Sequence, residues 1–367
     1  MANFDLTNLA VKMIAPSNEV IIDEIGLPSV MVYIPKFKLS DVLNTTDNST
    51  HPAFVVNGKE IDGFYASKYL NVVHNGAAYS LPAEDPAANI NFDNARARCE
   101  AKGNGWHLMT NAEWAAIALW CKKNGFMPKG NNNYGKDSSE SNYRAKPTSK
   151  DGEGRTCRTA TGTGPITWNH DGTMAGIADL NGNVWEWQGG FRTVFGEIQL
   201  LANNDAADPD NPQNNTALCW KAIRASDGAL VNPENTIADG KITISGSTVR
   251  LKWSGSAWIY SNNMGENTPS EYKGHIFANL TADSSISNAA KLLLRALALL
   301  PDEGAAAADY EGDYCYFNAS LDERCAYRGG LWLSGGSAGL FYLNAYYGRS
   351  YSSASFGFRS AYIPDIG

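Results

Sequence analysis

Apolar and polar residues alternate in several short stretches near the start of the chain. Met31 to Pro35 and Lys36 to Leu39 are predicted as two strands separated by a proline, and Glu60 to Tyr69 as a third. A period of two places every second side chain on the same face, so each strand is expected to bury one side. The pattern therefore predicts an antiparallel, half-buried β region before residue 70.

Farther along, apolar positions recur at intervals of three and four, which is the spacing of one helix face. Asn91 can cap a first helix that ends near Gly103. A second helix starts at Thr110, because Thr110 and Glu113 form a capping box in which each side chain can bond the other's backbone amide. Helix capping explains the presence of Glu113 at this position better than a role as a catalytic acid does. The apolar faces consist of Phe92, Ala95 and Cys99 in the first helix and of Trp114, Ile117, Ala118 and Cys121 in the second.

The middle of the chain has a different pattern. Residues 126–170 are rich in Gly, Asn, Lys and Ser and are predicted as long loops. Short alternating runs then occur at Lys241–Ile244, Val249–Trp253 and Ala257–Tyr260. They are separated by the turn residues Asp239–Gly240, Ser245–Ser247 and Ser254–Ser256 and predict a β-meander. An amphipathic helix from Ile286 to Leu297 should end before Pro301. This block is interpreted as an insertion.

Composition excludes some classes of function. The 367 residues are 43% hydrophobic, enough for a large core, and the formal charge of −8 argues against nucleic acid or an anionic membrane as the main partner. No apolar run approaches the roughly 18 residues that span a bilayer, so membrane insertion is not expected. The first residues lack a basic region followed by an apolar one, so we expect cytosolic synthesis without a signal peptide. The six cysteines form no C-x-x-C pair.

The C-terminal segment, Arg328 to Tyr362, has the composition of a contact surface. Between Leu331 and Gly357 it contains a single charged residue, Arg349, among many Tyr, Ser, Gly and Ala residues. Binding loops use this mixture because Tyr offers a large rigid surface at low entropic cost, while Ser and Gly adapt. An ordinary Tyr-rich region of strands and loops remains an alternative at this point.

An acidic turn runs from Gly176 to Trp187. Asp179, Asn181, Asn183 and Glu186 are interleaved with two tryptophans there. Carboxylates beside backbone carbonyls are the oxygen ligands that calcium needs. The alternative is an Asp/Asn-capped turn with Trp187 in the core.

These pieces, in this order, resemble the formylglycine-generating-enzyme-like (sulfatase-modifying-factor) branch of the C-type lectin fold. The resemblance covers roughly 30–190 and 315–364, and it implies an α+β fold with two helices and twisted antiparallel sheets. It divides the chain into an N-terminal arm (1–28), a lectin-fold domain (29–190 and 311–367) and a β-rich insertion (191–310). The matching motifs are Met31–Pro35, Phe64–Tyr69, His107–Trp114, Asp179–Trp187, Arg328–Gly330 and Gly357–Arg359.

The resemblance also implies a structural calcium ion as cofactor. Its ligands would be the side chains of Asp179 and Glu186 and the carbonyls of Gly182 and Val184. The family's enzymes hold copper with two cysteines shortly after R-G-G, but the matching positions here are near Ser334 and Gly339, and no cysteine lies between Leu331 and Gly357. Because a copper(I) site needs thiolates, we expect a scaffold without catalysis.

The C-terminal segment further resembles the variable proteins of diversity-generating retroelements, many of which are phage tail receptor-binding proteins. Their mutagenesis replaces template adenines, and from AAC codons it reaches Leu, Ser, Tyr, Ala, Phe, Gly and Asp but not Lys, Glu or Gln. This mutagenesis would explain why Lys, Glu and Gln do not occur between Leu331 and Gly357. The resemblance implies twelve variable ligand-binding positions: Leu331, Leu333, Ser334, Ser337, Tyr342, Asn344, Tyr346, Tyr347, Tyr351, Ser353, Ala354 and Ser355.

The sequence therefore suggests a non-enzymatic receptor-binding protein on a phage tail surface, diversified over about 328–362. Its partner would be a protein or glycan on a target cell. Several copies of the chain, for example in a homo-oligomer, would add avidity. The alternatives are a copper-dependent oxidase of the formylglycine-generating type and a calcium-dependent sugar-binding lectin.

Overall fold

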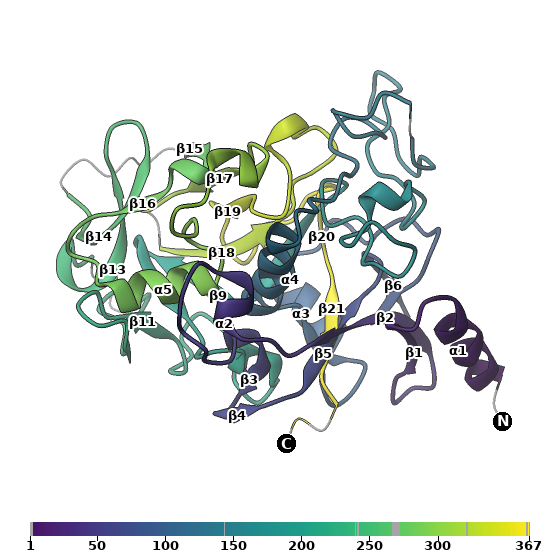
Figure 1. Cartoon of the computed structure of the whole chain (residues 1–367), viewed down its shortest axis with the longest axis horizontal. Coiled ribbons are helices and arrows are strands. Elements are labelled where there is room, and N and C mark those ends of the chain that lie inside the picture. Colours follow the sequence, from purple (N-terminus) through teal and green to yellow (C-terminus); the bar gives the residue numbers. More distant parts are fainter. Residues whose placement is uncertain are drawn as a thin grey trace.

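The computed structural model describes residues 3–142, 144–238, 240, 242–265, 272–320, 322–364 and 366. It has an α+β architecture built on two main sheets (Figure 1). The smaller sheet has the strand order β1-β2-β5-β21-β8, so the last strand of the chain lies between two early ones. Its strands are β1 (Asn18–Ile22), β2 (Pro28–Pro35), β5 (Gly63–Ser67), β8 (Trp106–Leu108) and β21 (Ser360–Tyr362).

The larger sheet has twelve strands among the described residues. Its main path is β15-β17-β19-β18-β9-β10-β13-β14-β16, with β11 on β10, β12 on β11 and β20 on β9. The long strand β9 begins at Trp185, within the acidic turn. The strands are β9 (Trp185–Val194), β10 (Glu197–Leu200), β11 (Lys221–Ile223), β12 (Leu230–Val231), β13 (Ser245–Trp253), β14 (Trp258–Asn263), β15 (Lys273–Ile276), β16 (Thr281–Ala282), β17 (Tyr314–Phe317), β18 (Glu323–Arg328), β19 (Leu343–Ala345) and β20 (Phe356–Phe358). Two small hairpins complete the strands, β3–β4 (Val55–Val56, Lys59–Glu60) and β6–β7 (Asn71–His74, Ala77–Ser80).

The two predicted central helices are present as α3 (Phe92–Glu100) and α4 (Asn111–Lys123). The capping box of α4 is confirmed: the Glu113 amide donates to Thr110 Oγ1 at 3.1 Å, and the Thr110 amide donates to Glu113 Oε2 at 2.9 Å. Glu113 is fully buried and also contacts His107 Nε2 at 2.8 Å and Asn204 Nδ2 at 3.0 Å. The carboxylate thus connects the helix to nearby His107 and to the distant Asn204 as well as capping it. Cys99 and Cys121, which were predicted to lie on the apolar faces of these helices, are both buried.

The insertion extends the larger sheet. Strand β9 continues past residue 190, and β10, β13 and β14 follow it as neighbours. Helix α5 (Asn288–Ala296) agrees with the predicted amphipathic helix and is capped by Ser287, whose hydroxyl accepts from the Ala290 amide. The division into arm, lectin-fold domain and insertion stays a prediction, and residues 1–2, 239, 241 and 266–271 of the arm and insertion lie outside the described residues.

Several local predictions differ from the structure. The N-terminal arm contains helix α1 (Asn3–Ile14) and the edge strand β1, to which the sequence pattern assigned no structure. Lys36 to Lys38 form no strand, and a short helix α2 (Leu39–Val42) begins where a strand was expected. Ile242 to Ile244 are not a strand, while the supposed turn Ser245–Ser247 belongs to β13, because Ser245 pairs with Asn263 across a register shift.

The C-terminal segment connects the two sheets. After β18 it forms β19, which lies between β17 and β18, then β20 beside β9, and finally β21 in the small sheet. The loops between these strands lie at the top of Figure 1, between the insertion and the loops of residues 126–170. Within the described part of the chain, every helix is too short or too polar to cross a membrane.

Candidate functional site

The C-terminal segment begins at a buried arginine. The Arg328 guanidinium donates from Nε and Nη2 to Asn111 Oδ1 at 3.1 and 2.8 Å, and from Nη2 to the carbonyls of Leu297 and Ala298 at 3.3 and 3.0 Å. These carbonyls follow helix α5, where the helix dipole favours a cation. Arg328 therefore joins the start of the segment to both α4 and the insertion.

Gly330, directly after this anchor, has a φ of +93°, a conformation that glycine adopts without strain. A Cβ atom there would lie 2.7 Å from Cβ of Ala338 and 3.1 Å from the ring of Tyr342. The missing side chain lets the returning loop pack against the start of the segment.

A second buried arginine ends the segment. The Arg359 guanidinium forms a two-pronged ion pair with Glu186, with both N–O distances at 3.0 Å, and donates to the carbonyls of Ser67 and Ala178 at 2.8 and 2.9 Å. Burial raises the pKa of Glu186, and the guanidinium opposes that shift. Arg359 thus ties the end of the segment to strand β9 and to the small sheet.

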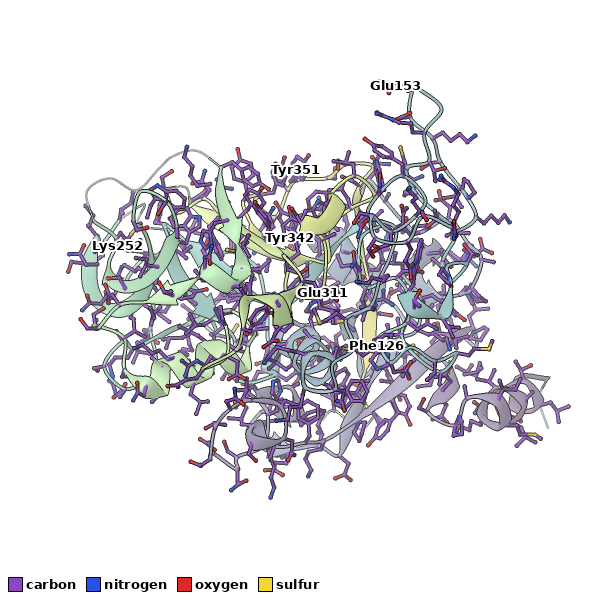
Figure 2. The ribbon with its side chains drawn as sticks, turned by 45° about the horizontal axis from the view of Figure 1, so that its top comes forward. Phe126, Glu153, Lys252, Glu311, Tyr342 and Tyr351 are labelled. Carbon is purple, nitrogen blue, oxygen red and sulfur yellow. The ribbon has the colours of Figure 1, made fainter. Side chains whose placement is uncertain are left out.

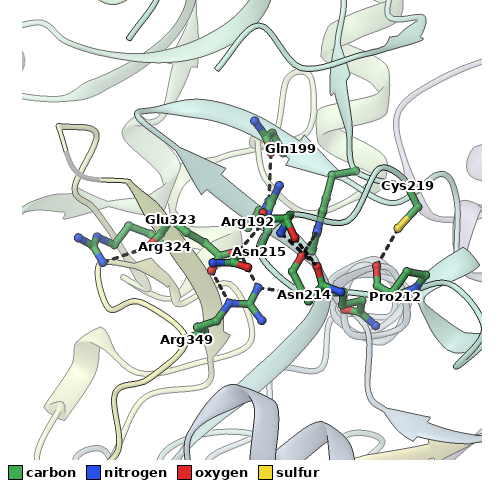
Figure 3. Close-up of polar contacts among 12 residues, drawn as sticks. Arg192, Gln199, Pro212, Asn214, Asn215, Cys219, Glu323, Arg324 and Arg349 are labelled. Carbon is green, nitrogen blue, oxygen red and sulfur yellow. Dashed lines mark hydrogen bonds and ion pairs between the residues drawn. The ribbon is translucent and has the colours of Figure 1, made fainter. Parts of the chain in front are cut away.

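A third arginine holds the middle of the segment (Figure 3). Arg349 donates to both carboxylate oxygens of Glu323 at 2.5 and 2.6 Å, to Asp93 at 2.6 Å and to the Gln213 carbonyl at 2.9 Å. Glu323 also pairs with Arg192 at 2.7 Å. Burial raises the pKa of Glu323, but the two arginines outweigh burial and hold it below its usual range. The loop between β19 and β20 is thereby fixed at its centre.

Main-chain hydrogen bonds hold the rest of the segment. Scaffold amides donate to carbonyls of the segment, and segment amides donate to scaffold carbonyls. Asp313 adds a side-chain bond by accepting from the Phe341 amide at 2.7 Å, and burial raises the pKa of Asp313 to about 8. The backbone pairs are Trp332–Asn183, Gly335–Asn132, Tyr347–Cys325, Arg349–Phe92, Ser353–Asn89 and Ser355–Trp185, with N–O distances of 2.8–3.3 Å.

Ten of the twelve predicted contact positions are at least partly exposed. Leu333 is 53% exposed. In Figure 2, Tyr351 lies at the outer edge of the molecule and Tyr342 lies deeper. The exposed positions are Leu333 and Ala354, and the half-buried ones are Leu331, Ser334, Ser337, Tyr346, Tyr347, Tyr351, Ser353 and Ser355.

Tyr342 and Asn344 are buried, with exposed fractions of 6% and 1%, so the expectation that they face a partner is corrected. The Tyr342 ring packs edge-on against Trp185 with ring centroids 4.5 Å apart. Asn344 lies on β19 between β17 and β18, and its Nδ2 donates to the Tyr272 hydroxyl at 2.9 Å. Both side chains therefore support the surface from beneath.

The predicted calcium ligands do not fit calcium as they are arranged. Both oxygens of Glu186 are taken by the Arg359 guanidinium, and Asp179 Oδ2 accepts from the Gly162 amide at 2.6 Å. The misfit lies with these two carboxylates, since Gly182, in a β-bridge with Asn131, and the buried Val184 would offer only backbone carbonyls. Over the described residues, no group of three or more His, Cys, Asp or Glu side chains could hold a metal ion.

Sequence reasoning missed three tyrosines that lie beside the segment. Tyr314 and Tyr316 alternate on β17, and Tyr272 precedes β15. The Tyr272 ring stacks on Tyr316, with centroids 4.2 Å apart, and contacts Tyr346 at 4.7 Å. The alternation of Tyr314 and Tyr316 around a buried cysteine was the available signal, since it places both rings on one face.

Comparisons with known proteins identify a family. The model described as "Sulfatase-modifying factor enzyme 1-like domain" matches residues 12–214, which is more than half of the chain. The match starts inside the predicted arm and ends inside the predicted insertion. A comparison with curated proteins finds no match.

Several solved structures are similar to this chain. "Major Tropism Determinant U1 Variant" is 13% identical, with 91% of this chain and 62% of that one covered and a TM-score of 0.30. "Major Tropism Determinant I1 Variant" has the same identity and coverage and a TM-score of 0.32. "Structure of PvdO from Pseudomonas aeruginosa" is 12% identical, with 91% and 94% covered and a TM-score of 0.35. The chain thus spans less than two thirds of the tropism determinants, and scores of this size carry no argument about function.

Because Glu186 is already paired with Arg359, we predict that added calcium does not stabilise the protein. Thermal unfolding in millimolar calcium chloride and in excess EDTA should give the same Tm, because the guanidinium already neutralises the carboxylate. A metal bound at a hundred times its Kd would add about 2.7 kcal/mol. A higher Tm in calcium than in EDTA would contradict the prediction.

Replacing Arg349 by methionine should loosen the loop between β19 and β20. The substitution should cost about 2 kcal/mol, because Glu323 loses a partly buried two-pronged donor and keeps only Arg192. Amide hydrogen exchange over 346–355 should accelerate, and the free energy of urea unfolding should fall. Arg155→Met is the control, since Arg155 pairs with Asp151 and Glu153 on an exposed loop and should change stability by less than about 1 kcal/mol. Unchanged exchange over 346–355 would refute the anchoring role.

Proposed function

The chain belongs to the sulfatase-modifying factor enzyme 1-like family, and from that premise we propose that it uses this fold as a non-enzymatic scaffold for binding a ligand. The ligand contacts the ten exposed or half-buried positions of the C-terminal segment. These positions form the contact face: Leu331, Leu333, Ser334, Ser337, Tyr346, Tyr347, Tyr351, Ser353, Ala354 and Ser355.

One observation carries the proposal: the hydrogen bonds and ion pairs that hold the segment to the rest of the protein do not use side chains of the contact face. Three arginines and a set of main-chain hydrogen bonds fix its path. The side-chain hydrogen bonds of Ser334, Ser353 and Ser355 remain within the segment. Side chains of the contact face can therefore change while the backbone keeps its path.

A face that tolerates change suits a protein whose specificity is altered by mutation. All ten positions carry residues that adenine replacement can reach from AAC codons, and Lys, Glu and Gln do not occur between Leu331 and Gly357. We propose that a diversity-generating retroelement rewrites the region encoding about 328–362. The protein would then recognise a host receptor from a phage tail, with several copies adding avidity.

The copper-dependent oxidase alternative lacks its cysteine ligands in the C-terminal segment. Copper(I) requires thiolates, and the nearest cysteines along the chain, Cys315 and Cys325, are buried free thiols. Oxidation of a cysteine-containing peptide by the copper-loaded protein would revive this alternative. The lectin alternative requires sugar binding that a chelator abolishes, and the Glu186–Arg359 pair does not favour it.

The genome offers the most direct test of diversification. DNA flanking the gene should contain a near-identical copy of the region encoding 328–362 that differs only at adenines, beside a reverse-transcriptase gene. The variable codons follow from the contact face, so differences should concentrate at its ten positions and spare Arg328, Arg349 and Arg359. Absence of both the copy and the reverse transcriptase would remove the retroelement from the proposal.

Tolerance of substitution can be measured without knowing the ligand. Tyr346→Ser should change the free energy of unfolding by less than about 1 kcal/mol, as expected for a surface side chain. The matched control is Tyr327→Ser, whose fully buried ring packs against Trp185, Trp187 and Phe356, and which should lose about 3–5 kcal/mol. Equal losses in urea unfolding would mean that the contact face is part of the core.

A further inference from the structure

The contact face continues onto residues outside the C-terminal segment. Three tyrosines of the segment and three from elsewhere form an unbroken series of ring contacts, which we call the tyrosine row. Successive ring centroids are 5.6, 4.2, 4.7, 4.9 and 3.5 Å apart. In order, the tyrosine row consists of Tyr314, Tyr316, Tyr272, Tyr346, Tyr347 and Tyr351.

All six rings reach solvent. Tyr272 is 43% exposed and the other five are partly exposed. A buried series of rings would be core packing, whereas an exposed one presents ring edges and hydroxyl groups to a partner. Exposed aromatic side chains of this extent, rimmed by polar residues, are typical of protein contact surfaces.

The backbone of β15 and β17 has room for the tyrosines of the row that lie outside the C-terminal segment. Gly274 pairs with Tyr316 across β15 and β17, and a Cβ atom at Gly274 would lie 2.0 Å from the Tyr316 ring. The absent side chain lets that ring lie against β15, where Tyr272 stacks on it with an interplanar angle of 6°. Asn344 Nδ2 then donates to the Tyr272 hydroxyl and fixes its position.

We propose that Tyr272, Tyr314 and Tyr316 form a constant half of the binding surface, next to the changeable half, and that the partner is a folded protein with an uncharged contact patch. This inference rests on the proposed function of the C-terminal segment. Residues 272–316 lie outside 328–362, so every diversified version keeps these three rings. They supply affinity common to all versions, and the segment supplies the differences.

Two observations favour a protein over a glycan. A sugar ring needs an open aromatic face, yet in two pairs of the row, Tyr272–Tyr316 and Tyr347–Tyr351, each ring covers one face of the other, with interplanar angles of 6°. Charge also matters: Arg349, the one charged residue between Leu331 and Gly357, is paired with Glu323 and Asp93. The ion pairs leave no free charge of Arg349 for an anionic sugar or a charged patch.

The test uses the whole chain displayed on yeast, with Tyr346, Tyr347, Tyr351, Ser353, Ala354 and Ser355 randomised to the residues reachable from AAC. Selection is against purified myoglobin, a folded protein of nearly neutral charge, and in parallel against cross-linked dextran. Myoglobin-binding clones then receive Tyr272→Ser with Tyr316→Ser. The expected result is at least a tenfold weaker Kd in most clones, and a Kd that changes less than twofold when salt is raised.

Control variants separate binding from folding. Tyr33→Ser changes a half-buried tyrosine of the small sheet, whose ring contacts Tyr65, and should leave each Kd within twofold. If the double variant does not unfold cooperatively, Tyr314→Glu replaces it, because that change adds a charge at the end of the row while Tyr272 and Tyr316 keep their stacking. The same tenfold loss is expected.

The outcomes are distinct. Clones that keep their affinity after these substitutions, but lose it when the randomised positions revert, overturn the constant half and leave the proposed function intact. Enrichment on dextran without enrichment on myoglobin overturns the protein partner. No enrichment on either target overturns the proposed function and this inference together.

Discussion

The arrangement of the C-terminal segment depends on the buried ion pair between Arg359 and Glu186. These residues are 173 positions apart in sequence, and their side chains are almost completely inaccessible to solvent. A buried charge without a partner is costly, so each residue requires the other. Strand β9, which carries Glu186, must therefore meet the link between β20 and β21, which carries Arg359. Because Arg359 also bonds carbonyls of Ser67 and Ala178, one guanidinium joins both sheets and the acidic turn.

Two further arginines fix the start and the middle of the segment. Arg328 does so through hydrogen bonds to Asn111 and to backbone carbonyls, and Arg349 does so through ion pairs with Glu323 and Asp93. A guanidinium is suited to this use, since its rigid fork makes several directed hydrogen bonds and keeps its charge. The three arginines divide the segment into two short spans, each closed at both ends. When both ends of a loop are fixed in this way, the path of the backbone depends less on which side chains lie between them.

Local features of the fold were predictable, and features that depend on distant pairing were not. The capping box of Thr110 and Glu113 was predictable because it lies within four residues, as were the apolar faces that bury Cys99 and Cys121. The ordered motifs also identified the family fold. Burial of Tyr342 and Asn344 was not predictable, because it follows from the parallel pairing of β17 with β19 and from the missing side chain at Gly330. The same limit applies to Glu186, whose partner lies far along the chain, and to Tyr272, whose position is set by Tyr316.

The position of β21 has a consequence for biosynthesis. This strand is synthesised after β1, β2, β5 and β8, yet it lies between β5 and β8 and is bonded to both. The small sheet therefore cannot close until residues 360–362 have been made. A chain that stops before β21 leaves β5 and β8 without the strand that joins them. Closing the small sheet therefore requires that the whole C-terminal segment before β21 has been made.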